Sequence, residues 1–333
     1  MDLDLVFFGT AGSMPSAQRA PSAILVRRGG ERLLFDCGEG TQRQMLRSTV
    51  GLVDLEDVFL THYHADHYLG LPGMLKTFAL RGRDRPIRIF GPPGLSELFA
   101  ALRRIFGKLT YEYELVTLRP GDAVPRDDYR IETFAPNHGV PGIGYSIVEN
   151  LRPGRFDAEA ADALGVPVGP ERGALQRGES VTLPDGRVLT PDLVLGAPRA
   201  GRKVVLAGDT APSAAVVEAA HGADVLVHEA TFLEDEQERA RETLHSTALE
   251  AAEVAREAEI GLLVLTHVSN RYAGPEIEGE ARAVFTETVV PRDFDVVEVP
   301  YPERGTPRLV EKAVRPRRVV SPPPEPVTLE ERV

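Results

Sequence analysis

Three histidines and one aspartate fall within six consecutive residues, His62-Tyr63-His64-Ala65-Asp66-His67. Neutral imidazole and carboxylate are natural ligands of zinc. Residues 55–61 read as a buried strand and 70–80 carry a helical apolar pattern, so the motif falls on a strand-to-helix loop where side chains can converge. A lone histidine is usually a core or surface residue, but this clustering predicts a metal site.

Three further candidate ligands each follow an apolar or strand-like run. They occur in Asn137-His138-Gly139, Gly208-Asp209-Thr210 and Thr266-His267-Val268. One carboxylate has two oxygens, so Asp209 is a natural bridge between two cations about 3.5–4 Å apart. With the first motif, these residues predict the ligands of a two-metal centre: His62, His64, Asp66, His67, His138, Asp209 and His267.

Strands and turns must position these side chains. The chain opens with three short strand-like runs separated by Gly- and Pro-bearing turns, which indicates antiparallel β structure at 3–8, 23–27 and 32–36. Two further helices are expected at 95–105 and 246–259. Later strand-like runs imply a second sheet, and they lie at 87–90, 114–118, 129–134, 143–148, 203–207, 224–227 and 262–265.

The character of the chain changes from about 150 to 200, where repeated prolines and glycines leave little room for long core elements. We expect a flexible projecting arm here, inserted into a catalytic domain that spans 1–310. The remaining residues, 311–333, have few core-forming side chains and a proline-rich run at 322–326, so a disordered tail is expected.

Composition sets broad limits on function. The 333 residues are 42% hydrophobic and 26% charged, which is ordinary for a globular protein and unlike collagen or a coiled coil. A formal charge of −12 argues against wholesale adhesion to nucleic acid or anionic membranes. We expect a cytoplasmic protein with no membrane segment, because the start lacks a signal-peptide pattern and Cys37, the single cysteine, has no internal disulfide partner.

The order of these motifs, from His62–His67 to a separate histidine, Gly-Asp-Thr and a last histidine, resembles the metallo-β-lactamase superfamily. The resemblance implies an α/β fold, the four-layer αββα sandwich. It also implies that Asp36 orients the site from behind the ligands. The first zinc would be held by His62, His64, His138 and Asp209, and the second by Asp66, His67, Asp209 and His267.

Additional motifs are similar to those of the ribonuclease Z family of tRNA 3′-processing endonucleases: Gly9-Thr10, Asp36–Gln42, His228–Thr231, Leu244–Thr247 and Thr266–Tyr272. Gly169-Pro170 resembles the family's exosite arm, which grips tRNA away from the active site. The resemblance implies two zinc ions per subunit, precursor tRNA as substrate, and a homodimer in which one subunit's arm holds tRNA for the other's site. The products would be tRNA with a 3′-hydroxyl and a trailer with a 5′-phosphate.

Three residues are assigned catalytic roles. Zinc lowers the pKa of a bound water toward neutrality, and Asp66 is the expected acceptor of its proton. His245, backed by Glu229, is the expected donor to the leaving 3′ oxygen, since a carboxylate keeps imidazole charged and oriented. Without the resemblance, His245 would be read as a polar residue at a helix start.

One loop of this sequence differs from the family pattern, and that loop bears on the position of cleavage in the precursor tRNA. The family's Pro-x-Lys-x-Arg-Asn loop corresponds to Pro15–Ala20, which has Ala17 and Ala20 in place of lysine and asparagine. That loop is associated with the 3′ end of tRNA, so refusal of transcripts that already carry CCA is not implied for this chain.

Three other readings remain open from the sequence. The nearest is a general zinc phosphodiesterase of the same superfamily that acts on small diesters. A redox di-iron protein on the same fold would need a different metal, and the chain has no flavin domain after it. An RNA-binding module without catalysis would have little reason to keep seven candidate ligands.

Overall fold

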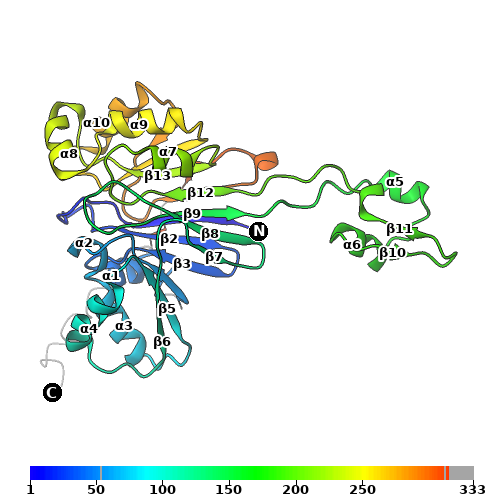
Figure 1. Cartoon of the computed structure of the whole chain (residues 1–333), viewed down its shortest axis with the longest axis horizontal. Coiled ribbons are helices and arrows are strands. Elements are labelled where there is room, and N and C mark those ends of the chain that lie inside the picture. The colour runs from blue at the N-terminus through cyan, green and yellow to red at the C-terminus, as the bar shows by residue number, and fades with distance from the viewer. Residues whose placement is uncertain (53–54, 311–312, 315–333) are drawn as a thin grey trace, which may run out of the picture.

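The computed structural model describes residues 1–52, 55–310 and 313–314. Two large β-sheets face each other, and helices cover their outer faces (Figure 1). The expected αββα sandwich is confirmed.

The first sheet has eight strands. Its first hairpins are antiparallel as expected, with Leu5 opposite Val26 and Leu25 opposite Leu34, and the strands from β3 to β6 are parallel. In spatial order the strands are β17 (Arg308–Val310), β16 (Val296–Glu298), β1 (Leu3–Gly9), β2 (Ala23–Arg28), β3 (Glu31–Phe35), β4 (Asp57–Phe59), β5 (Ile87–Gly91) and β6 (Tyr113–Thr117).

The second sheet has seven strands. In spatial order they are β15 (Thr288–Val289), β14 (Leu262–Thr266), β13 (Val225–Glu229), β12 (Lys203–Leu206), β9 (Gly144–Glu149), β8 (Tyr129–Phe134) and β7 (Ala123–Pro125). Strands β12 to β15 are parallel, whereas β9 pairs antiparallel with β12.

Helices pack on the outer face of each sheet (Figure 1). On the first sheet they are α1 (Thr41–Arg47), α2 (Ala65–Tyr68), α3 (Leu71–Leu80) and α4 (Leu95–Phe106). On the second they are α7 (Ala214–Ala220), α8 (Gln237–Thr243), α9 (Ala248–Glu257) and α10 (Gly274–Arg282), with the 3₁₀ turn η2 (Glu234–Glu236). A further 3₁₀ turn, η3 (Pro302–Arg304), follows β16 of the first sheet. Among the described helices, none is long and apolar enough to span a bilayer.

The strand sequences explain the layers, because alternate side chains point to opposite faces of a sheet. Phe7, Ile147 and Val204 belong to a buried cluster shared by the two sheets. In the same cluster Phe59 stacks between Phe35 and Phe90, with ring centroids 4.9 and 4.5 Å apart. One further buried cluster lies between the first sheet and its helices, and another lies between the second sheet and its helices.

Residues 150–202 leave the body between β9 and β12 and carry a small module at their far end (Figure 1). Its elements are short, as the proline and glycine content predicted: α5 (Ala158–Ala163), α6 (Pro170–Gln176), β10 (Val181–Thr182), β11 (Val188–Leu189) and the 3₁₀ turn η1 (Pro191–Leu193). The module has its own apolar cluster, which includes Val166 and Leu175. The projecting arm is therefore present, and its flexibility stays a prediction.

Several element limits differ from those expected. The strand expected at 55–61 is paired only over β4, because the chain leaves the sheet before it reaches His62. The helix expected from 246 begins at Ala248, where Thr247 and Glu250 form a capping box. Most of the tail at 311–333 lies outside the described residues, but Ala313 is buried and Val314 bridges to Ser48.

A buried ion network at the base of the arm predicts a large loss of stability. Glu149 accepts hydrogen bonds from Arg202 (2.7 and 2.9 Å) and from Arg28 (2.9 Å), and the side chains of all three are at most 3% exposed. Glu149→Gln removes the buried carboxylate that the two guanidinium groups share, so we expect the free energy of unfolding to fall by about 3–5 kcal/mol in urea titrations.

Asp128→Asn is the matched control, because Asp128 also pairs with Arg28 (2.7 Å) but its side chain is 56% exposed. A loss of under about 1 kcal/mol is expected for that variant. Equal effects of the two substitutions would contradict the importance of burial here.

Candidate metal centre

The candidate ligands come from loops that follow strands of both sheets. His62 follows β4, and His138 lies on the loop after β8. Asp209 follows β12 and His267 follows β14. The loop after β4 also leads into α2, which carries the last two members of the first motif. Residues that are up to 205 positions apart in sequence thereby meet at one edge of the sandwich.

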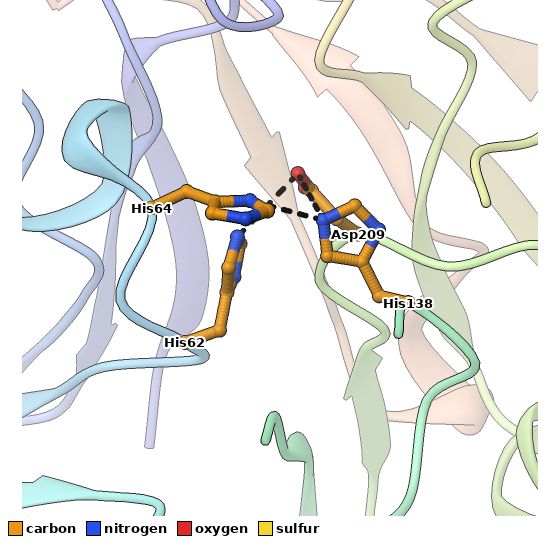
Figure 2. Close-up of side chains that lie close together, drawn as sticks. All are labelled: His62, His64, His138 and Asp209. Atoms are coloured by element: carbon orange, nitrogen blue, oxygen red, sulfur yellow. Dashed lines mark hydrogen bonds and ion pairs between the residues drawn. The ribbon is translucent and has the colours of Figure 1, made fainter. Parts of the chain in front are cut away.

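The first ligand group contains His62, His64, His138 and Asp209, whose side chains point toward one another (Figure 2). One ligand atom from each lies within 4.8 Å of the others. His138 Nε2 is 3.1 Å from His64 Nδ1. Asp209 Oδ2 lies 3.8 Å from Nε2 of both His62 and His138.

The second group contains Asp66, His67 and His267. Asp66 Oδ2 lies 3.5 Å from His67 Nε2 and 3.4 Å from His267 Nε2. Asp209 reaches this group too, with Oδ2 at 3.3 and 3.2 Å from the same two nitrogens. A carboxylate that faces both groups is what a bridge between two cations requires.

Hydrogen bonds on the far side of the rings hold the imidazoles in place. His67 Nδ1 is 2.7 Å from Asp36 Oδ2, and Asp36 in turn accepts from Thr61 N (2.9 Å). His138 Nδ1 donates to the Leu244 carbonyl (2.9 Å). Such contacts fix the tautomer and leave Nε2 with a lone pair toward a metal. The expected orienting position of Asp36 is confirmed.

The donor set fits metal ions. Nε2 of His62 and His67 are buried and form no hydrogen bond of normal geometry with the described residues. Burial, reinforced by the neighbouring His67, lowers the pKa of His62 to about 2, so this imidazole is neutral and able to coordinate. Buried polar atoms without partners are costly, and a cation would satisfy them. Seven nitrogen and carboxylate donors of this kind suit zinc.

Glu229 and His245 lie beside the two groups. Glu229 ends β13, is 1% exposed, and its Oε1 is 2.7 Å from His245 Nδ1. The opposite oxygen, Oε2, accepts from Thr231 Oγ1 (2.6 Å). Burial opposes the charge on His245, but the Glu229 carboxylate outweighs it and raises the pKa of His245 to about 9. The ring centroids of His245 and His138 are also 4.7 Å apart.

The structure thus brings together all seven candidate ligands and the candidate catalytic pair; their individual roles stay predictions. A third combination also occurs, because ligand atoms of Asp209, His245 and His267 lie within 4.8 Å of one another. His245 is therefore within reach of a metal as well as within reach of Glu229.

Two residues of the quoted motifs have supporting roles that were not assigned from the sequence. Leu244 supplies the carbonyl that holds His138 and has a φ of 55°, a left-handed conformation unusual for leucine. Its place in the Leu244–Thr247 motif was the available signal. Gly38 is a second case, because a Cβ there would lie 2.3 Å from the carbonyl oxygen of Asp66. Only glycine allows this loop to pack against the metal motif.

Comparisons with known proteins agree with this geometry. Residues 17–267 match the model of the metallo-beta-lactamase superfamily. The chain is 44% identical over 304 residues to a Ribonuclease Z of Methanosarcina acetivorans, covering 90% of this chain and 99% of that protein. It is 50% identical over 271 residues to a Ribonuclease Z of Myxococcus xanthus, covering 81% and 88%.

Solved structures show the same architecture. The short form of human tRNase Z is 27% identical, with a TM-score of 0.64 over 89% of this chain and 99% of the other. The metallo-beta-lactamase fold protein YhfI of Bacillus subtilis is 21% identical, with a TM-score of 0.66 over 90% and 100%, and supports the fold alone. The chain therefore belongs to the ribonuclease Z family of the metallo-beta-lactamase superfamily.

Proposed function

We propose that this protein is a zinc-dependent endoribonuclease that removes the 3′ trailer from precursor tRNA. The observation that carries the proposal is the buried Glu229 carboxylate bound to His245 beside the two ligand groups, in a chain 44–50% identical to proteins named Ribonuclease Z. A paired acid next to a metal centre is suited to breaking a phosphodiester whose leaving oxygen needs a proton.

Two zinc ions are proposed for each subunit. His62, His64, His138 and Asp209 would hold one ion, and Asp66, His67, Asp209 and His267 the other. When bound, the ions supply Lewis acidity toward the phosphate and activate water for attack on phosphorus.

Side chains of the protein accept and donate the protons of the reaction. Asp66, whose side chain is 13% exposed, would accept the proton of the attacking water. His245, held by Glu229 through Nδ1, presents Nε2 as donor to the 3′ oxygen as the phosphorus–oxygen bond breaks. The tRNA then ends in a 3′-hydroxyl and the trailer carries the 5′-phosphate.

The arm is proposed to bind tRNA at a distance from the chemistry. The two segments that connect the arm's module to the two-sheet body hold it well away from that body (Figure 1), which supports a homodimer in which one subunit's arm serves the other's centre. A cytoplasmic location follows from this substrate and agrees with a single buried cysteine, Cys37.

Removal of the arm distinguishes a precursor tRNA endonuclease from a general phosphodiesterase that acts on small diesters. Replacing 155–195 by a short Gly-Ser turn should lower the rate of precursor tRNA cleavage by about 10²-fold or more, because a linked second binding site is lost. Hydrolysis of bis(p-nitrophenyl) phosphate should stay within about twofold of wild type, because a small diester gains nothing from a remote binding site. Equal loss of both activities would count against an exosite and favour the phosphodiesterase alternative.

Metal content tests the ligand assignment. Wild type should retain two zinc ions per chain by elemental analysis after dialysis. His62→Ala should retain one and lose cleavage, because the first group then has three donors in place of four. His221→Ala is the control, since His221 is exposed and outside both groups. Unchanged metal content in His62→Ala would contradict the assignment.

A further inference from the structure

The two segments that connect the arm to the body form a paired stalk. Arg152 N donates to the Arg199 carbonyl (2.8 Å), and Arg199 N donates back to the Arg152 carbonyl (2.9 Å). Further out, Gly154 packs so closely against Gly196 that a Cβ would lie 1.9 Å from its carbonyl oxygen. The stalk is therefore a narrow two-stranded ribbon whose strands are paired through their backbones.

One carboxylate binds both strands of this ribbon. Glu303, in η3, accepts two hydrogen bonds from the guanidinium of Arg152, at 2.8 Å to Oε1 and 2.9 Å to Oε2. Its Oε1 also accepts from Arg199 Nη1 (3.0 Å). Bidentate arginine pairs fix orientation as well as distance.

An aromatic ring completes the contact. The guanidinium carbon of Arg152 lies 3.6 Å from the ring centroid of Tyr301, and that of Arg202 lies 4.0 Å from the same centroid. Arg202 is anchored in turn, because it pairs with Glu149 and donates to the Val299 carbonyl (2.9 Å). Tyr301 therefore rests on a fixed arginine and holds a stalk arginine by a cation–π contact.

These contacts join different sheets. The stalk continues β9 and β12 of the second sheet, whereas Tyr301 and Glu303 follow β16 of the first. The ribbon alone is free to bend at its base, since a two-stranded ribbon has no third strand to stiffen it. A contact from the other sheet removes that freedom.

The direction of the stalk decides where the module sits. The apolar cluster of the module is made of arm residues alone, between 156 and 194. Figure 1 shows the module at the far end of the long stalk. A small rotation at the base becomes a large displacement at the tip, and bound substrate must reach a metal centre whose position is fixed.

We propose that Glu303 and Tyr301 form a clamp that sets the direction of the arm, and that they are positioning residues for the binding of precursor tRNA. The clamp rests on the proposed function of the arm. It acts through Arg152 and Arg199 and needs no contact with the RNA itself.

The clamp contributes little to folding, because its ion pairs are partly exposed: the side chains of Arg199 and Glu303 are 42% and 41% exposed. Its effect is on geometry, and it should appear in the KM for precursor tRNA.

Glu303→Gln keeps the shape of the side chain and removes its charge. We expect KM to rise about tenfold, because a mispositioned second site lowers the effective concentration of substrate at the centre, while kcat changes less than about twofold.

Glu303→Asp should recover much of the lost affinity, because it restores a carboxylate. Glu253→Gln is the matched control: Glu253 is an exposed glutamate on α9 that pairs with Arg256 at 3.9 Å. If Glu303→Gln and Glu253→Gln have the same KM, the clamp has no role in binding.

Arm direction can be measured without substrate. Spin labels attached to Val188→Cys in the module and to Glu257→Cys on α9 report the distance between them by pulsed electron paramagnetic resonance. The native Cys37 is buried, so the labelling reagent should not reach it. Glu303→Gln should broaden the distance distribution, and Glu253→Gln should not. An unchanged distribution overturns the clamp, and so does a broadened one combined with unchanged KM.

These readouts separate the clamp from the function on which it rests. If the chain without 155–195 still cuts precursor tRNA normally, the proposed arm function fails, and the distance distribution alone then decides whether Glu303 holds the stalk. If that deletion abolishes cleavage while Glu303→Gln behaves as wild type in both measurements, only the clamp fails.

Discussion

Asp66→Ala should slow the cleavage of precursor tRNA by about 10³-fold or more, because it removes both a candidate ligand and the proton acceptor. Asp66 Oδ2 lies within 3.5 Å of His67 and His267, and its loss leaves the bridging Asp209 as the carboxylate that reaches both imidazoles. Single-turnover cleavage at saturating enzyme measures the loss without interference from product release.

Asp66→Asn separates the two roles, since the amide keeps an oxygen for coordination but is a far weaker base. A variant with two zinc ions and a large loss of rate identifies Asp66 as the proton acceptor. Asp127→Ala, at an exposed position, is the control and should cut at the wild-type rate. Normal cleavage by Asp66→Ala would make the proposed mechanism wrong.

His245→Ala should slow precursor tRNA cleavage by about 10²–10³-fold, within the range that general acids contribute. The reason is the leaving group: the 3′ oxygen of a ribose is a strong base and must be protonated as it departs. Bis(p-nitrophenyl) phosphate has a leaving group that departs without a proton, so its hydrolysis should fall far less, by under about tenfold.

Metal content decides between the two positions open to His245. Its ligand atom lies within 4.8 Å of those of Asp209 and His267, so a ligand role is geometrically available. A proton donor held by Glu229 predicts two zinc ions retained in His245→Ala. Loss of zinc, together with equal losses on both substrates, would contradict the general-acid role and assign His245 to the metals.

Much of the metal centre was predictable because its ligands occupy short, local motifs at strand ends. The first motif supplies four side chains within six residues, and Asp209 and His267 each follow an apolar run that forms a strand. What places them together is the parallel order of β12 to β14, which the sequence indicates only as alternating strands and helices.

The supporting contacts were not predictable. The Leu244 carbonyl reaches His138 because α8 ends in a left-handed residue, and nothing in the leucine itself requires that conformation. Short helices were also missed, including α1, α7 and α10, because seven to nine residues give a weak periodic signal. The Glu303 clamp joins residues 151 positions apart and has no local pattern at all.

The prediction of the substrate rested on other residues than the prediction of the metal site. The ligand motifs are compatible with several two-metal hydrolases, and only Glu229, His245 and the arm narrowed the choice. The similarity to proteins named Ribonuclease Z supports that narrowing over 90% of the chain.

Mapping the products of precursor tRNA cleavage tests the central claim most directly. Transcripts with and without encoded CCA would be incubated with zinc-loaded wild type and with Asp66→Ala, and both product ends determined. The proposed chemistry predicts one cut at the start of the trailer, with a 3′-hydroxyl on the tRNA and a 5′-phosphate on the trailer, made about 10³-fold more slowly by Asp66→Ala. A tRNA that ends in a cyclic phosphate, or the same cut at the same rate by both proteins, would contradict it.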